Sequence, residues 1–248
     1  MFFRMSDFMS KSHRPLIELQ KVARNSPLPD RVAAVLRGRY GDHAHFNRKN
    51  PLDELLFIFC STKTQESSYR GTYAALRGEF PAFSRLAEAP AEYIARPLVP
   101  GGLHRQKSQA IRRTCDAIIA RFGRLTLSPL QGMDDAACEA FLTSLPGVGK
   151  KVARCVMMYS LGREVFPVDT HCWRIARRLG WVRPTQKDGH CAPRDMDRLQ
   201  QKIPPPLRFS LHVNFVSLGR EFCKAGTPDC GNCPIQSLCP MGKKSPAR

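Results

Sequence analysis

Apolar residues recur with helical spacing along most of the chain. In residues 109–122 they stand at positions 111, 115, 118, 119 and 122, one face of an amphipathic helix, and Gly123 follows as a helix-ending residue. Similar patterns predict further helices over residues 15–24, 29–40, 134–145, 150–159, 170–179, 193–203 and 208–219. The apolar run 52–60 suits a buried strand as well as a helix, but every clear element after it is helical. We therefore predict an all-α protein.

Residues 145–151, Leu-Pro-Gly-Val-Gly-Lys-Lys, form a turn at the start of one of these helices. Gly147 and Gly149 allow a sharp turn and a close approach to another surface, because neither carries a Cβ atom. The helix that follows presents unpaired N–H groups at its start, which suits a phosphate. The glycines and Val148 between them are therefore candidates for binding a nucleic acid.

The two lysines that end this motif differ in their position on the helix. At about 100° per residue, Lys150 lies opposite the apolar stripe and Lys151 lies about 85° from its centre. Lys150 is therefore expected to be a solvated charge, available to a phosphate. Partial burial of Lys151 is expected to lower its pKa and to make its amine a nucleophile. Asp169, eighteen residues later, adds a carboxylate that can also cap the helix over residues 170–179.

The net charge of +18, with an isoelectric point near 9.9, is spread along the chain and favours a nucleic acid or another anionic partner. No apolar run approaches the roughly 18 residues of a membrane helix, and the N-terminus lacks a secretory signal. We expect a cytoplasmic protein that does not bind membranes. In that reducing compartment ten cysteines point to metal binding or isolated thiols.

Four of these cysteines follow the spacing C-x6-C-x2-C-x5-C in a segment interrupted by prolines and glycine: Cys223, Cys230, Cys233 and Cys239. Four thiols in so short a loop indicate a metal centre, which can hold zinc or an iron–sulfur cluster. A zinc site more often pairs two C-x2-C units, and the single unit here favours [4Fe–4S]. The other six cysteines are expected to be small core residues.

Several motifs together resemble the helix-hairpin-helix DNA glycosylases of the endonuclease III type, from about Pro51 to Cys239. They are the four cysteines, LPGVGKK (145–151), VDTH (168–171), GLHRQK (102–107) and HVNFVSLGREFC (212–223).

The resemblance implies two α-helical domains with double-stranded DNA bound in the cleft between them. Residues 52–163 would form a six-helix barrel, and residues 15–51 and 164–240 a second domain with the cluster. Residues 1–14 would be a flexible extension and residues 241–248 a basic tail. A monomer associated with the nucleoid is expected, acting on damaged bases or abasic sites.

In this family the lysine at the position of Lys151 attacks C1′ of an extruded nucleotide. The aspartate at the position of Asp169 stabilises positive charge on the sugar. The resemblance therefore implies a bifunctional DNA glycosylase and AP lyase of base-excision repair, with a [4Fe–4S] cluster on the four cysteines.

Further residues are expected at the DNA. Leu103 matches the family's wedge position, and His104, Arg105 and Lys107 are candidates for phosphate contacts. In the family, a glutamine after the first long helix fills the gap left by the extruded nucleotide. Here Lys63 stands at that position, with Gln65 two residues on. The family's usual substrate, oxidised pyrimidines, is therefore not carried over to this chain.

Two alternatives stay open from the sequence. One is a mismatch-specific or adenine-type glycosylase of the same superfamily, a branch that generally lacks the lysine at position 151. The other is a non-catalytic, cluster-bearing DNA-binding protein, which would keep the hairpin, the cysteines and the charge.

Overall fold

The computed structural model describes residues 25–186 and 189–244, and within these ranges the regular secondary structure is helical. This confirms the all-α prediction. The helices are α1 (Leu28–Tyr40), α2 (Pro51–Ser61), α3 (Glu66–Glu79), α4 (Phe83–Glu88), α5 (Ala91–Leu98), α6 (His104–Phe122), α7 (Asp135–Ser144), α8 (Lys150–Leu161), α9 (Thr170–Arg178), α10 (Pro193–Lys202) and α11 (Arg208–Glu221). Among the described residues, no helix has both the length and the apolar character needed to cross a membrane.

The helices predicted from residue 29 onward agree with the structure to within a few residues, with one exception. The helix predicted over 109–122 begins earlier, at His104. The stretch 66–98 holds three helices, α3, α4 and α5, for which no helix was predicted. The extension 1–14, the helix expected over 15–24 and the last residues of the basic tail lie outside the described residues.

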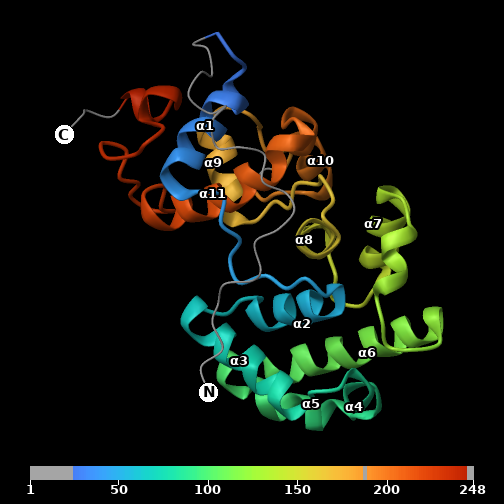
Figure 1. The fold of residues 1–248 in the computed structure, drawn as a ribbon. Helices are drawn as coiled ribbons and strands as arrows, with labels where there is room; N and C mark the ends of the chain where they lie inside the picture. The colour runs from blue at the N-terminus through green and yellow to red at the C-terminus, as the bar shows by residue number, and fades with distance from the viewer. Residues whose placement is uncertain (1–24, 187–188, 245–248) are drawn as a thin grey trace, which may run out of the picture.

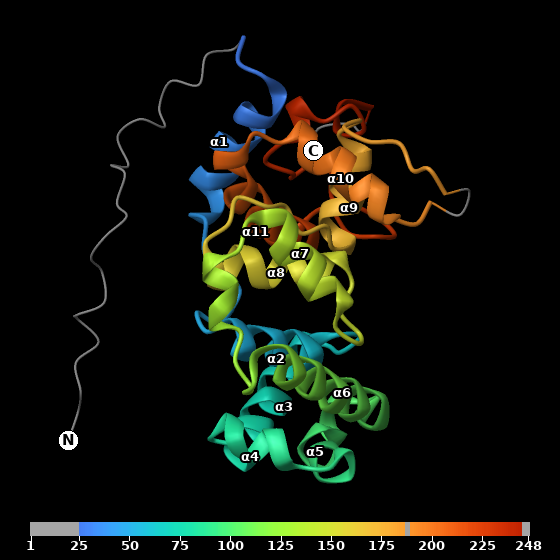
Figure 2. The ribbon, with the colours of Figure 1, turned by 90° about the vertical axis from the view of Figure 1, so that its right-hand side faces the viewer.

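The buried side chains form two hydrophobic cores, which correspond to the two lobes in Figures 1 and 2. One core is built by α2 to α8 and ends at Val165. The other begins with α1 and continues from Phe166 through α9, α10 and α11 to the cysteine loop. Five of the six scattered cysteines are buried, as predicted, and Cys191 is half-buried.

Capping residues determine where several helices begin and end. Asn50 caps α2, with its Oδ1 accepting a hydrogen bond from the backbone N–H of Leu52 at 2.9 Å. Asp134 caps α7 in the same way through the backbone N–H of Ala137. α8 ends at Gly162, which adopts the left-handed conformation typical of a residue that follows a helix. The connectors 41–50 and 162–169 then lead the chain between the lobes (Figure 1).

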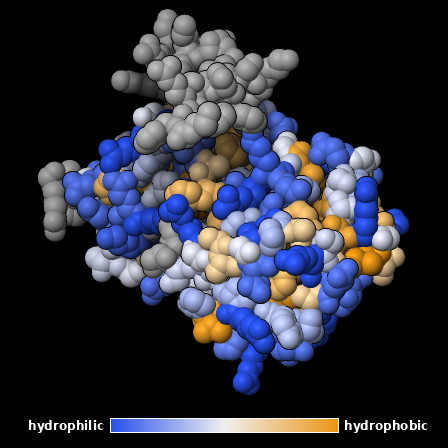
Figure 3. Space-filling view, turned by 60° about the horizontal axis from the view of Figure 1, so that its bottom comes forward, coloured by the Kyte–Doolittle hydropathy of each residue, from blue (hydrophilic) through white to orange (hydrophobic). Residues whose placement is uncertain are grey.

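Hydrophilic residues cover most of the face shown in Figure 3, and hydrophobic residues there form scattered groups. Over the described chain, the large hydrophobic side chains that are exposed are Val35, Phe46, Tyr93, Val99, Leu103, Phe209 and Met241. Leu103, at 43 % exposure, belongs to this small set, although it precedes a long, well-packed helix.

Candidate active site

An open cavity of about 630 Å³ lies where α2, α8, α11 and the start of α9 meet. α8 contributes Lys151, and the N-terminus of α9 contributes Asp169. The loop after α2 contributes Lys63. The structure therefore brings three residues singled out in the sequence to one site, from segments that are far apart along the chain.

The glycine hairpin before α8 has a specific steric requirement. Gly147 has a φ of +79°, and a Cβ atom there would lie 3.2 Å from the Phe59 ring and 3.3 Å from Ala110. Thr114 of α6 donates a hydrogen bond of 2.9 Å to the carbonyl of Pro146, which holds the hairpin against α6. Gly147 and Gly149 are exposed, but the Val148 side chain is buried in the core. The hairpin therefore leaves its glycine backbone accessible, whereas the Val148 side chain packs in the core.

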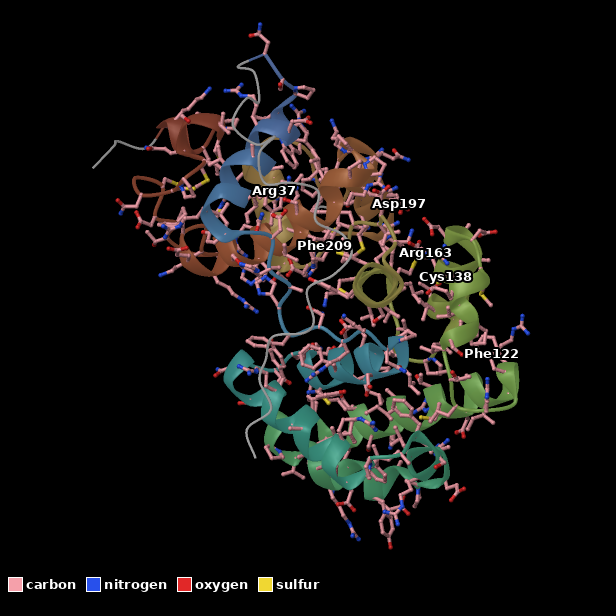
Figure 4. The ribbon with its side chains drawn as sticks, viewed as in Figure 1. Arg37, Phe122, Cys138, Arg163, Asp197 and Phe209 are labelled. Carbon is pink, nitrogen blue, oxygen red and sulfur yellow. The ribbon has the colours of Figure 1, made fainter. Side chains whose placement is uncertain are left out.

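Lys150 is engaged within the protein, contrary to the expectation of a solvated charge. Its Nζ donates to both carboxylate oxygens of Asp197, at 2.9 and 2.7 Å, and lies 3.4 Å from Glu139. Buried Arg154 binds the same two carboxylates. Figure 4 labels Asp197 beside α10, on the side facing α7. The lysine that was expected to bind phosphate is therefore part of an ion-pair cluster between the lobes.

The pKa of Lys151 lies above its ordinary value. The largest contribution comes from the sulfur of Cys155, and the carboxylates of Asp169 and Glu54 act in the same direction, against burial. Burial raises the pKa of the Cys155 thiol to about 11. The expectation of a lowered pKa is therefore wrong for the free protein.

Asp169 occupies the N-cap position of α9, as predicted. Its Oδ1 accepts a hydrogen bond of 2.7 Å from the backbone N–H of Cys172. Burial alone would raise the pKa of Asp169. Positive charge on His212, the hydrogen bond from the Cys172 N–H and the charge of Lys151 together outweigh burial, so the pKa lies below its ordinary value. His212 is itself buried, with a pKa lowered to about 4. Near neutral pH, Asp169 is therefore an ionised carboxylate beside a neutral histidine.

Glu54 is a candidate site residue that the sequence reasoning missed. It is 0 % exposed, and its carboxylate accepts hydrogen bonds from the Asn47 side chain at 2.5 Å and from the Arg48 backbone at 2.6 Å. Burial raises its pKa to about 7, and the charge of Lys151 is among the influences that oppose this rise. The available signal was an acidic residue inside an apolar helix, because such residues are seldom fully buried without a partner.

The connector before α2 also reaches the site, because His45 and Asn47 line the cavity. His45 Nε2 lies 2.9 Å from the carbonyl oxygen of Val213 on α11. Asn47 links the connector to Glu54 on α2. No sequence pattern pointed to these two residues, because the connector has no hydrophobic periodicity and tertiary packing alone places it.

Lys63 and Leu103 share an unusual backbone conformation. Both are exposed, and their φ angles are +51° and +53°, in the left-handed region that residues with a Cβ seldom adopt. Gln65 is exposed immediately before α3, and His104 begins α6. Their roles at DNA stay predictions, and their positions leave their side chains accessible.

Lys107 does not occupy the expected position at a phosphate. It is 5 % exposed, and its ammonium group donates hydrogen bonds to the carbonyls of Cys60 and Gly101 and to the hydroxyl of Thr64. The three donors of the ammonium group are therefore used inside the protein.

The four cysteines of the C-terminal loop, Cys223, Cys230, Cys233 and Cys239, line one small cavity together with Arg178. Burial, followed by the charges of the three neighbouring sulfurs, raises the pKa of Cys233 to about 11. Arg178 donates a hydrogen bond of 3.1 Å to the sulfur of Cys223. Among the described residues, no group of three His, Cys, Asp or Glu side chains is placed to hold a single metal ion. The four predicted ligands nevertheless share one site.

Comparisons with known proteins place this site in a family context. Residues 58–200 match the HhH-GPD superfamily of base excision DNA repair proteins. A protein of Arabidopsis thaliana named as a DNA glycosylase is 31% identical over 198 residues, which are 77% of this chain and 61% of that protein. Endonuclease III of Bacillus subtilis is 28% identical over 195 residues, 79% of this chain and 83% of the relative.

The fold is also similar to that of a solved endonuclease III structure. The structure of a non-covalent endonuclease III–DNA complex superposes with a TM-score of 0.73 at 26% identity, over 86% of this chain and 94% of that chain. The chain spans 61% of the Arabidopsis relative and 12% of DEMETER-like protein 2, also from Arabidopsis.

Proposed function

Because the chain belongs to the HhH-GPD superfamily of base excision DNA repair proteins, we propose that it is a bifunctional DNA glycosylase and AP lyase. One observation carries this proposal: α8 and the start of α9 present Lys151 and Asp169 to the same open cavity. The net charge of +18 supports DNA as the substrate. The two lobes would act as two domains, with the DNA lying across them.

The chemistry begins on a nucleotide turned out of the duplex, because its sugar cannot be reached within the stacked helix. Lys151 first gives up its ammonium proton to water. Its neutral amine then attacks C1′, and the electron pair of the bond to the base leaves with the base, which takes up a proton from the attacking nitrogen. Positive charge develops on the sugar as this bond breaks, and ionised Asp169 stabilises it. The C1′–O4′ bond then breaks, its electron pair and the remaining proton of the amine go to O4′, and the lysine nitrogen and C1′ form a Schiff base. The Schiff base acidifies the C2′ proton, so that β-elimination releases the 3′ phosphate and cuts the strand.

We also propose that Cys223, Cys230, Cys233 and Cys239 hold a [4Fe–4S] cluster. The donor set fits, because four thiols face one cavity and Arg178 places a positive charge beside the Cys223 sulfur. When bound, the cluster would close the loop between Cys223 and Cys239, beside Arg178 at the end of α9.

The cluster is checked by the colour and metal content of the purified protein. We expect a yellow-brown sample with broad visible absorbance and about four iron atoms per chain. A colourless sample with one zinc atom per chain would contradict the cluster.

Borohydride trapping tests the proposed chemistry, because reduction of the Schiff base leaves a covalent protein–DNA adduct. We expect the wild type to be trapped on a duplex with an abasic site and Lys151→Gln to lose this by at least about a thousandfold. Lys202→Gln is the matched control, since it removes an exposed lysine of α10 and should be trapped like the wild type. Trapping of Lys151→Gln at the wild-type rate would show that another amine attacks the sugar.

The same assay on a panel of damaged and mismatched duplexes tests which base is removed. Lys63 lines the cavity where the family carries a glutamine, so we propose that it influences the choice of the opposing base. A Lys63→Gln variant with the wild-type preference for the opposing base would contradict this role.

A further inference from the structure

Lys107 joins two loops that are separated by about forty residues in the sequence. Its ammonium group donates to the carbonyl of Cys60 at 3.0 Å, to the hydroxyl of Thr64 at 2.6 Å and to the carbonyl of Gly101 at 3.1 Å. The first two acceptors belong to the end of α2 and to the α2–α3 loop (residues 62–65), and the third to the α5–α6 loop (residues 99–103). The buried cation therefore uses its full set of donors to hold the two loops together.

Further contacts reinforce this connection. The Thr64 hydroxyl itself donates to the Gly101 carbonyl at 2.8 Å, so the two loops are also bonded directly. Gly101 packs tightly against α3, where a Cβ atom would lie 2.8 Å from the Thr72 hydroxyl. The backbone N–H of Lys107 donates to the Leu103 carbonyl at 2.9 Å. The α5–α6 loop is thus fixed on three sides.

Each loop carries one exposed residue in a left-handed backbone conformation, Lys63 in the first and Leu103 in the second. Such a conformation at a residue with a Cβ persists only where its surroundings impose it, and it is concentrated at functional sites. Lys107 bonds Thr64, the residue after Lys63, and Gly101, two residues before Leu103. These bonds supply the constraint.

We propose that Lys107 is a positioning residue that locks the α2–α3 and α5–α6 loops into one rigid unit, so that Lys63 and Leu103 enter the DNA together. This inference rests on the proposed function. Burial of a cation lowers the pKa of Lys107 and is costly, and a surface phosphate contact would require no such burial. Extrusion of a base needs a wedge and a gap-filling group at the same time, whereas chemistry at the sugar depends on Lys151 and Asp169.

The proposal predicts a selective defect in Lys107→Met, which keeps the side-chain length and loses the charge and the donors. We expect single-turnover excision of a damaged base paired within a duplex to fall by at least about tenfold. Trapping on a preformed abasic site in single-stranded DNA should change by less than about twofold, because no base has to be extruded there. Arg113→Met is the matched control, since it removes an exposed cation from the same helix away from both loops.

Two further measurements keep the test decisive. Thr64→Val removes both hydroxyl links and should show the same selective defect, whereas Thr64→Ser keeps the hydroxyl and should restore duplex excision. If thermal unfolding shows that Lys107→Met does not fold, the two Thr64 variants test the connection between the loops in its place. Fluorescence of 2-aminopurine beside the damaged base should rise on binding of the wild type and stay low with Lys107→Met.

The outcomes separate the two proposals. Equal losses on both substrates, or wild-type rates and fluorescence with Lys107→Met and Thr64→Val, overturn the positioning role. A wild type that is not trapped on any substrate overturns the proposed chemistry, and the fluorescence comparison then still tests the positioning of the loops.

Discussion

Two carboxyl groups near Lys151 titrate in opposite directions from their ordinary values. The pKa of Asp169 is lowered, because hydrogen bonding and nearby positive charge outweigh burial. The pKa of Glu54 is raised to about 7, because burial dominates. Near neutral pH, Asp169 is ionised and can stabilise charge on the sugar, whereas Glu54 is close to its midpoint and can exchange a proton.

The Glu54 environment predicts that Glu54→Gln becomes more favourable to stability as the pH rises. The folded pKa of about 7 lies above the unfolded value of 4.5, so Glu54 contributes no penalty below pH 4.5. The penalty grows as the pH rises from 4.5 to 7, where the carboxyl is ionised in the unfolded chain and still protonated in the folded protein, and it is complete above pH 7. At 1.36 kcal/mol per unit, the full effect is about 3 kcal/mol.

Thermal unfolding of the wild type and of Glu54→Gln at pH 5 and pH 8.5 checks this prediction. The difference in melting temperature between the two proteins should shift in favour of the variant at pH 8.5. A difference that does not depend on pH would mean that Glu54 has an ordinary pKa in the folded protein.

At the scale of helices, one glycine sets the distance between α11 and α9. A Cβ atom on Gly219 would lie 2.3 Å from Nδ1 of His171 and 2.8 Å from its Cβ, closer than real side chains approach. Arg174 of α9 donates to the Gly219 carbonyl at 3.2 Å across the same contact. Because α9 begins at its cap, Asp169, this close crossing fixes the carboxylate at the cavity.

Gly219→Ala is therefore expected to destabilise the protein, although alanine is the better helix former. Separating the two helices should cost about 1–3 kcal/mol of unfolding free energy and lower base excision through displacement of Asp169. Gly38→Ala in α1 is the control, since nothing lies within 4 Å of its added Cβ atom and it should stabilise by up to about 1 kcal/mol. Denaturant unfolding measures both changes. Equal effects in the two variants would show that the α9–α11 contact can relax.

Hydrophobic periodicity predicted helices such as α6, α8 and α9, in which one face is apolar and the other polar. It did not identify the helices between residues 66 and 98. In α3 the polar and small residues Gly71, Thr72 and Gly78 dilute the apolar stripe, and α4 and α5 have six and eight residues. Such short elements are defined by packing against α6 more than by their own sequence.

The sequence predicted the position of a site residue where neighbouring residues determine it. It did not predict the position where a residue distant in the sequence is the partner. Asp169 caps its own helix, so its place follows from the residues beside it. Lys150 and Lys107 were both expected at phosphates. In the structure Lys150 binds Asp197 and Lys107 binds Gly101, and these partners come from other parts of the fold that the pattern along one helix does not reveal. Glu54 likewise owes its raised pKa to burial by neighbouring helices.

At the scale of the whole molecule, an ion-pair cluster joins the two lobes. Glu139 of α7 and Asp197 of α10 both bind Lys150 and Arg154 of α8. Arg154 is 3 % exposed, so its charge depends on these carboxylates for compensation. α10 belongs to the second core and α7 to the first, so the cluster holds the lobes in the arrangement that forms the cavity.

Asp197→Asn is expected to lower the unfolding free energy by about 1–2 kcal/mol at pH 7, because it leaves Arg154 with one carboxylate while Asp197 itself is partly exposed. The control is Asp116→Asn, which breaks an exposed pair with Arg112 within α6 and should change stability by less than about 0.5 kcal/mol.

Burial raises the pKa of Asp197, but hydrogen bonds from Lys150 and Arg154 bring it below the ordinary value. Its contribution is therefore present above the unfolded pKa of 3.8 and is lost as the pH falls further. Urea unfolding should separate Asp197→Asn from the wild type at pH 7 and bring them together near pH 3, and a gap that persists in acid would show that the carboxylate charge is not what joins the lobes.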